Sequence, residues 1–130
     1  MTRGTRERER GTAVVEFALV LPLLLLITLA LVQVGLLVRD RLLVESAARA
    51  GARAATLAPD PGAIRRAATD AAPDLDAGAM RVGVARTGRR GDPVTVTIDY
   101  RSAVRVPLVG WLFGDGVAMR AQATDRQEFG

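Results

Sequence analysis

The chain has 130 residues, with 18 basic and 14 acidic side chains, and a formal net charge of +4. It contains no Cys and no His, which excludes disulfides, the usual zinc ligands and most nucleophile–base pairs of covalent catalysis. The basic residues are all Arg and are scattered, and aromatic residues make up only 4%. Nucleic-acid-binding proteins usually cluster such residues. We therefore expect no nucleic-acid partner, metal, cofactor or small-molecule substrate.

The N-terminal part combines a basic segment with a long apolar run. Residues 1–11 form a basic leader, of which we expect residues 1–10 to be disordered, and a single helix is expected over 12–57. From Phe17 to Val38 this helix carries no charge. Its ~22 residues rise ~1.5 Å each, or ~33 Å, enough to cross a hydrocarbon core of ~30 Å. A cleavable secretory signal has a shorter apolar core, so the run predicts a membrane span with a kink at Pro22.

The orientation of this span does not follow from charge counting. Basic residues flank both of its ends, so the positive-inside rule gives a tie. The short N-terminal tail has no fold to carry it across, whereas the C-terminal part resembles a folded domain. We therefore predict a single-pass protein of the cytoplasmic membrane, with its N-terminus cytoplasmic and residues from about 40 onward outside. The flanking basic residues are Arg3, Arg6, Arg8, Arg10, Arg39, Arg41, Arg49 and Arg53.

Beyond Val38 the predicted helix becomes amphipathic. One side is expected to be buried and the other to face solvent. A stripe of small residues, Ala47, Gly51 and Ala55, permits close approach of another backbone. Either the domain's own sheet packs there, which is usual for surface helices, or a neighbouring subunit's helix does. The expected buried side holds Leu42, Leu43, Ala47, Ala50, Gly51 and Ala54, and the polar sides hold Arg39, Asp40, Glu45, Arg49 and Arg53.

We predict that residues 58–130 form a small extracytoplasmic α+β domain. Pro59 to Gly62 end the long helix, and a short helix is expected over 63–72. Period-2 alternation predicts strands over 80–85, 94–101 and 117–122, the second reaching at most Val106. The predicted fold is α+β: a long N-terminal helix packed against a three-stranded antiparallel sheet. Three nearby acidic residues fit a solvated loop better than a cation site; they are Asp70, Asp74 and Asp76.

The stretch from Pro107 to Gly114 is the most apolar one outside the span. Two interpretations stay open. Trp111 and Phe113 fill a thin core, or they belong to an exposed loop that docks on a partner or touches the membrane, where Trp is favoured at headgroup level.

One residue pattern resembles a known family. The pattern begins with Gly11, which is followed after four residues by Glu16 and Phe17 at the start of the apolar run. Three further segments belong to it: EFALVLPLLLL, which begins at residue 16, RDRLLVESAARAGARAA, which begins at residue 39, and VPLVGWLFGDGVAMRAQAT, which begins at residue 106. Together they resemble TadE-like proteins, the minor pseudopilins of tight-adherence (Flp) pilus systems. The resemblance implies cleavage between Gly11 and Thr12 by a prepilin peptidase. It also implies that Glu16 pairs with the N-terminal amine of an adjacent subunit.

Three functions follow from these features. The resemblance implies a non-enzymatic assembly component of a pilus or secretion apparatus, whose partners are the bilayer, the peptidase, pilin-like subunits and platform proteins. An uncleaved accessory subunit of another envelope complex is the alternative; Glu16 is then an acid in a helix's first turn, which the helix dipole favours by ~0.3–1 kcal/mol. A membrane-tethered enzyme is the third possibility, with Ser46 and Ser102 as the two serines that could act as nucleophiles. Because neighbouring strand residues point to opposite faces, Ser102 forms no catalytic triad with Asp99 and Arg101.

Overall fold

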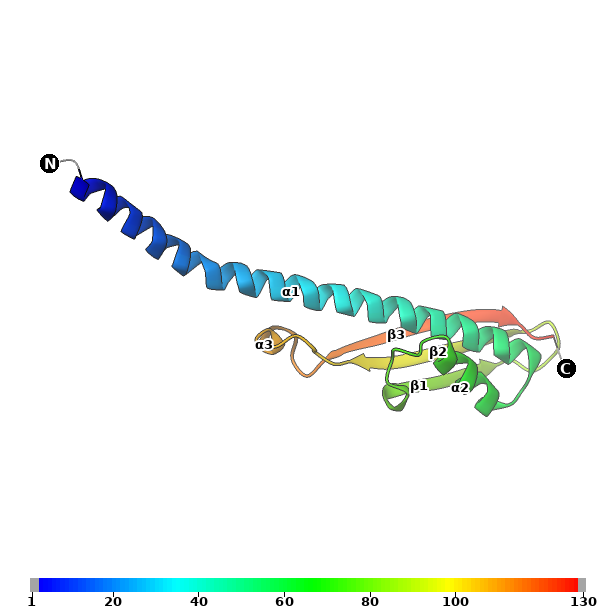
Figure 1. Ribbon diagram of the computed structural model, residues 1–130. Coiled ribbons are helices and arrows are strands. Elements are labelled where there is room, and N and C mark those ends of the chain that lie inside the picture. Colours follow the sequence, from blue (N-terminus) through cyan, green and yellow to red (C-terminus); the bar gives the residue numbers. More distant parts are fainter. Residues whose placement is uncertain (1–2, 129–130) are drawn as a thin grey trace.

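The computed structural model describes the backbone of residues 3–128 and the side chains of residues 11–128. Residues 1–2 of the expected leader lie outside this range. A long helix α1 is followed by a helix, three strands and a short helical turn, in an α+β fold as predicted (Figure 1). The elements are α1 (Arg3–Leu57), α2 (Pro61–Asp70), a 3-10 turn (Ala77–Ala79), β1 (Met80–Arg86), β2 (Pro93–Ser102), α3 (Gly110–Phe113) and β3 (Val117–Arg126).

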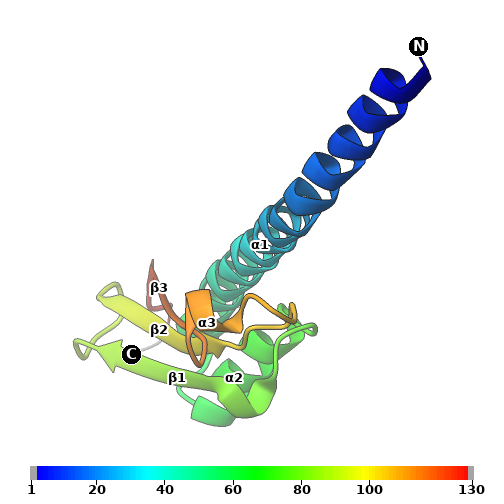
Figure 2. The ribbon, with the colours of Figure 1, turned by 90° about the vertical axis from the view of Figure 1, so that its left-hand side faces the viewer.

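The long helix begins earlier than expected. It starts at Arg3, so the prediction of disorder over residues 1–10 is wrong for residues 3–10. Good helix formers, Arg and Glu, dominate this segment, and the helix that follows already supplies the nucleus. The N-terminal half of α1 projects away from the domain and its C-terminal half lies along the sheet (Figures 1 and 2).

The sheet is antiparallel, with β2 between β1 and β3. In register, Ile98 of β2 faces Val82 of β1 and Ala121 of β3. Alternate β2 residues point to the same side, where Val94, Val96 and Ile98 are fully buried. α1 and α2 cover this side, which places the core between helix and sheet.

Small residues let α1 approach the sheet closely. Ala47 and Ala55 are fully buried, and a Cβ at Gly51 would lie 3.1 Å from Cγ1 of Val96. The small-residue stripe therefore packs on the chain's own sheet and α2, the first of its two interpretations.

The packing face of α1 is not the predicted one. Leu42, expected to be buried, is 59% exposed, and Asp40, expected on a polar side, is fully buried. The face that meets the sheet runs through Asp40, Val44, Ala47 and Gly51, a spacing of four, three and four residues. Leu42 lies outside this stripe, so hydrophobicity alone mislocated the contact.

Side chains from other elements complete the helix ends. α1 has no basic residue in its last turn, but Arg86 of β1 donates to the carbonyls of Ala55 and Ala58 at 2.9 and 3.0 Å. These carbonyls have no partner within the helix, so the contact both satisfies them and complements the helix dipole.

Asp60 caps α2 by accepting from the backbone N–H of Gly62. The helix begins two residues earlier than predicted because Pro61 fits its first turn.

The outer face of the sheet is polar and open to solvent. Thr95 and Thr124 share a hydrogen bond of 2.8 Å across β2 and β3. Asp99 accepts from Arg120 at 2.6 Å, and this contact raises the pKa of the Arg120 guanidinium. The predicted alternation of buried and polar positions is therefore confirmed on β2 and β3.

Gly116 lies where β3 begins and admits no side chain. Its φ is +128°, and a Cβ would lie 2.6 Å from the carbonyl oxygen of Ser102. We expect Gly116→Ala to lower the free energy of unfolding by about 3 kcal/mol, because strain adds to a backbone clash. Gly88 is the control: its φ is +118° but nothing lies within 4 Å. Gly88→Ala should lower it by about 1 kcal/mol.

The measurement is the urea midpoint of trypsin resistance for the full chain in detergent micelles. Equal midpoints for the two variants would show that the clash contributes nothing.

Candidate functional site

The predicted processing motif lies on the exposed N-terminal half of α1. Gly11, Thr12, Glu16 and Phe17 are all exposed. Apart from the neighbouring backbone of α1, no atom of the described residues lies within 4 Å of a Cβ position at Gly11. Thr12 and Glu16 are four residues apart and therefore share one helix face. The backbone is helical through the Gly11–Thr12 bond.

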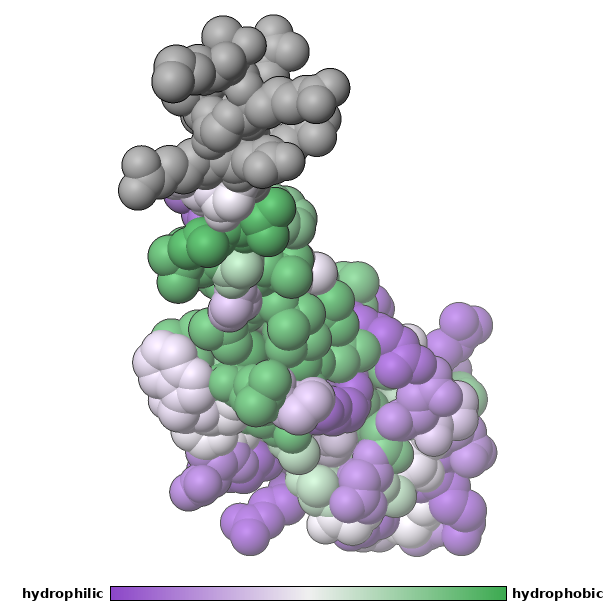
Figure 3. Space-filling model, turned by 60° about the vertical axis from the view of Figure 1, so that its left-hand side comes forward, coloured by the Kyte–Doolittle hydropathy of each residue, from purple (hydrophilic) through white to green (hydrophobic). Residues whose placement is uncertain are grey.

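The first part of the apolar run that follows, residues 17–28, is left uncovered by the described part of the chain. Leu19, Leu23 and Leu31 are 74%, 58% and 67% exposed, and Figure 3 shows the apolar surface of α1 above the polar surface of the domain. Soluble monomers rarely expose apolar patches of this extent. In length and composition this helix suits a membrane crossing, consistent with a single-pass membrane protein.

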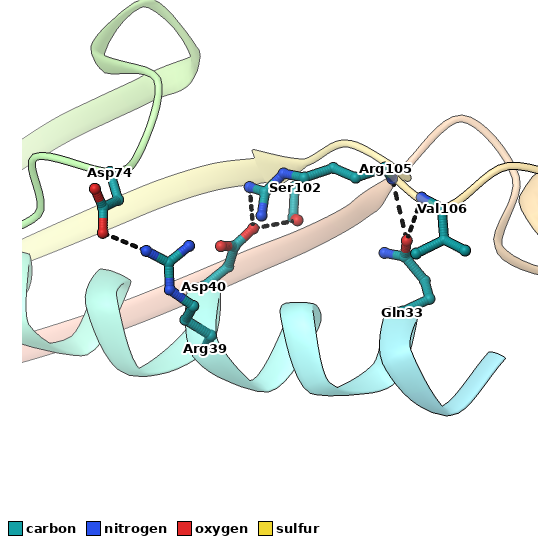
Figure 4. A network of polar contacts seen from close by, with 7 residues as sticks. All are labelled: Gln33, Arg39, Asp40, Asp74, Ser102, Arg105 and Val106. Carbon is teal, nitrogen blue, oxygen red and sulfur yellow. Dashed lines mark hydrogen bonds and ion pairs between the residues drawn. The ribbon is translucent and has the colours of Figure 1, made fainter. Parts of the chain in front are cut away.

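Gln33 fixes the end of the sheet domain along α1. Its side chain is fully buried, and its Oε1 accepts from the backbone N–H groups of Arg105 and Val106 at 3.1 and 3.0 Å (Figure 4). Gln33 Nε2 has no partner within the described part of the chain. One side chain thus ties the segment after β2 to α1 at the level of residue 33.

Asp40 forms the second tie, two helical turns further along. Its fully buried carboxylate accepts at Oδ2 from Ser102 Oγ at 2.5 Å and from the Arg105 guanidinium at 2.8 Å (Figure 4). Arg105 is 36% exposed, so the pair lies at the boundary of the core. A buried carboxylate is costly unless it is paired and hydrogen-bonded. Arg105 and Ser102 meet this need at Oδ2, whereas Oδ1 is buried without a hydrogen-bond partner in the described part of the chain. We call Gln33, Asp40, Ser102 and Arg105 the polar junction.

Sequence reasoning missed the polar junction. Gln33 was counted within the apolar run, and Asp40 was assigned to a solvent-facing side. The available signal was their spacing: seven residues apart, they share the helix face of Val44 and Ala47. Polar residues on a packing face indicate a buried hydrogen-bonded contact rather than solvation.

The apolar loop after β2 is anchored by two side chains and exposes three others. Val106 and Val109 are 9% and 3% exposed, whereas Leu108, Trp111 and Leu112 are 65%, 79% and 55% exposed. Trp111 therefore does not fill the core, and Phe113 is half-buried. Leu108 has a φ of +68°, a conformation that costs a Leu roughly 1–2 kcal/mol and that Gly or Asn adopts readily.

Three of the remaining candidate residues, Asp74, Asp76 and Ser102, have structural contacts. Asp74 pairs with Arg39, and Asp76 caps the 3-10 turn by accepting from Gly78. Asp70 is the last residue of α2. Ser102 is 1% exposed and donates to Asp40, which engages its hydroxyl in the core. Ser46 lies half-buried on α1.

The ion pair of the polar junction is expected to stabilise the domain. Arg105→Ala leaves the Asp40 carboxylate buried without a cation. We expect a loss of about 2–3 kcal/mol in unfolding free energy, below the ~3–5 kcal/mol of fully buried pairs because Arg105 is partly exposed. The double variant Asp40→Asn/Arg105→Gln should recover part of this loss, since it removes both charges.

The same urea-dependent trypsin assay in micelles measures this loss, with Arg90→Ala in the exposed β1–β2 turn as the control. If Arg105→Ala and Arg90→Ala shift the midpoint equally, the ion pair does not stabilise the domain.

The comparisons with known proteins agree with the residue pattern. The family model described as TadE-like protein matches residues 11–53. This segment contains the processing motif, the apolar run, Gln33 and Asp40. No curated protein and no solved structure matches the chain. The resemblance stated from the residues is thus confirmed for residues 11–53, the segment over which the chain is similar to TadE-like proteins.

Proposed function

We propose that the protein is a pseudopilin-like structural component of a tight-adherence pilus or a related secretion apparatus. The observation that supports this most is the position of Gly11, Glu16 and Phe17. They stand at the head of an exposed apolar helix, inside the segment that matches the TadE-like family. A TadE-like family suggests a protein associated with such a pilus, and such families are generally non-enzymatic.

The first step of the proposed function is processing. Residues 1–11 form a cytoplasmic leader, and a prepilin peptidase cuts between Gly11 and Thr12. Because a protease needs an extended backbone, the first part of α1 must unwind locally at this bond. Gly11 eases the unwinding, since Gly disfavours a helix by about 1 kcal/mol relative to Ala.

The second step is assembly within the membrane. Cleavage frees an amine at Thr12, on the same helix face as Glu16. The Glu16 carboxylate is costly in lipid, and the amine of an adjacent subunit neutralises it. The exposed apolar face of α1 packs against similar helices, and the sheet domain contacts other pilus components outside the membrane.

An uncleaved accessory subunit of another envelope complex is the second candidate. The continuity of α1 through the Gly11–Thr12 bond favours it, because the helix spans the membrane equally well without a cut. Processing therefore discriminates between the two candidates.

Processing is tested with Gly11→Val in a chain tagged at its C-terminus and expressed in a host with an active prepilin peptidase. The wild type should lose residues 1–11 and begin at Thr12 on N-terminal sequencing, whereas Gly11→Val should retain the leader. Gly35→Val is the matched control: Gly35 is also helical, with nothing within 4 Å of its Cβ position. This variant should be cut like the wild type. A wild-type chain that keeps Met1 and matches the mobility of Gly11→Val would favour the uncleaved subunit.

The role of Glu16 is tested by cross-linking. Because the chain has no Cys, Leu24→Cys, at a 49% exposed position, introduces a single thiol for disulfide formation between copies. Adding Glu16→Gln should leave cleavage intact and lower cross-linking about ten-fold, as expected for a loss of about 1.4 kcal/mol. Glu45→Gln removes a carboxylate outside the span and should leave cross-linking unchanged. Undiminished cross-linking in Glu16→Gln would count against the pairing.

A further inference from the structure

The apolar loop lies at the end of the domain nearest to the exposed part of α1. Gln33 holds its start through the backbone N–H groups of Arg105 and Val106, and the buried Val109 holds its middle. In Figure 1, α3 lies beyond the sheet, beside the part of α1 that leads to the exposed apolar run. The loop thus has a fixed height along the helix axis.

The outward side of the loop is apolar. Leu108, Trp111 and Leu112 are mostly exposed, and each would be better replaced by a polar residue if water were its only neighbour. Leu108 also keeps a left-handed backbone that Gly or Asn would adopt more easily. Contact with an apolar medium outside the chain explains both features.

The part of α1 that passes the loop is also apolar and exposed. Leu31, Val32 and Val34 of α1, which flank Gln33, are 67%, 50% and 46% exposed, and no charged residue occurs on α1 between Glu16 and Arg39. Trp is enriched where a bilayer's headgroups meet its acyl chains, since the indole has an apolar body and a polar N–H.

The height of the loop also fits the thickness of a bilayer. A count of ~20 residues back from Gln33, at ~1.5 Å each, covers a hydrocarbon core of ~30 Å and ends near Ala13. The span then covers about residues 13–32 rather than 17–38. The basic leader lies at its inner end and Arg39 beyond its outer end, while Glu16 lies about one turn inside the hydrocarbon.

We propose that Leu108, Trp111 and Leu112 insert into the headgroup–acyl boundary of the outer leaflet and set the depth of α1, so that the membrane begins at Gln33. The occupant of this surface is the lipid bilayer. The inference rests on the proposed placement of residues 40–130 outside the membrane, but it requires neither cleavage nor assembly.

Trp111 is the single Trp of the chain and reports directly on this contact. The full-length chain is reconstituted at high lipid-to-protein ratio into vesicles of phosphatidylcholine and phosphatidylglycerol, without peptidase. Trp111 emission should shift to the blue. Lipids brominated near the carbonyl end should quench it about two-fold more than lipids brominated near the methyl end, because the indole belongs at headgroup level. In Leu108→Asn/Leu112→Asp the shift and the quenching should be largely lost.

A relocated indole provides the control. In Trp111→Phe/Arg90→Trp the single indole lies in the exposed β1–β2 turn, at the Arg86-capped end of α1. Its emission should be water-like and unquenched by brominated lipid.

The proposal would be overturned if Trp111 itself gave water-like, unquenched emission in a chain that floats with the vesicles. A blue shift that appears only at high protein density, without quenching, would overturn it in favour of a neighbouring subunit. A chain that does not float with vesicles would refute both the span and this proposal, whereas failure of processing alone would leave the quenching unchanged.

Discussion

The contact between Asp40 and Arg105 determines where along α1 the part covered by the sheet domain ends and the exposed apolar part begins. Together with Gln33, it fixes where the sheet domain ends along α1. On one side of this point α1 is the covered half of a small core, and on the other its Leu and Val side chains are exposed. The junction thus separates the part of the helix that suits lipid from the part that suits water. Because the contact is polar and directional, it specifies one register between helix and sheet, which apolar packing alone would specify less sharply.

The need for such a tie follows from the composition of the core. The face of α1 under the sheet is largely Ala, with Gly51 where Val96 approaches most closely. Small side chains allow close packing but bury little apolar area per residue, so they stabilise a small domain weakly. Arg86 at the end of α1 and Asp40 near its middle add directed contacts at both ends of this thin core.

Local patterns predicted the sheet well and the helix–sheet contact less well. Period-2 alternation located the ends of β1 and β2 to within one residue. In a strand with one buried face, apolar and polar residues alternate along the sequence. β3 continues to Arg126, four residues beyond the prediction, since Thr124 and Asp125 pair through their backbones with β2 and need no apolar side chain. The start of α2 was predicted two residues late, although Asp60 followed by Pro61 is typical of a helix start. Asp40 was misassigned because its environment depends on the position of Arg105, which lies 65 residues away in the sequence. Leu42 was misassigned because it lies outside the stripe of α1 that meets the sheet. Trp111 could not be decided, because either burial or lipid satisfies an indole.

Two carboxylates of α1 show how these conclusions connect. Asp40 is buried by the protein and neutralised within the chain, by Arg105 from beyond β2. Glu16 lies in the exposed apolar part of the helix, and no ion pair of Glu16 occurs among the side chains of residues 11–128. If the membrane begins at Gln33, Glu16 is about one turn inside the hydrocarbon, where an unpaired carboxylate is costly. In that case the junction that completes the folded domain also sets the depth at which Glu16 needs a cation, and the proposed cleavage would provide this cation as the amine at Thr12 of a neighbouring subunit.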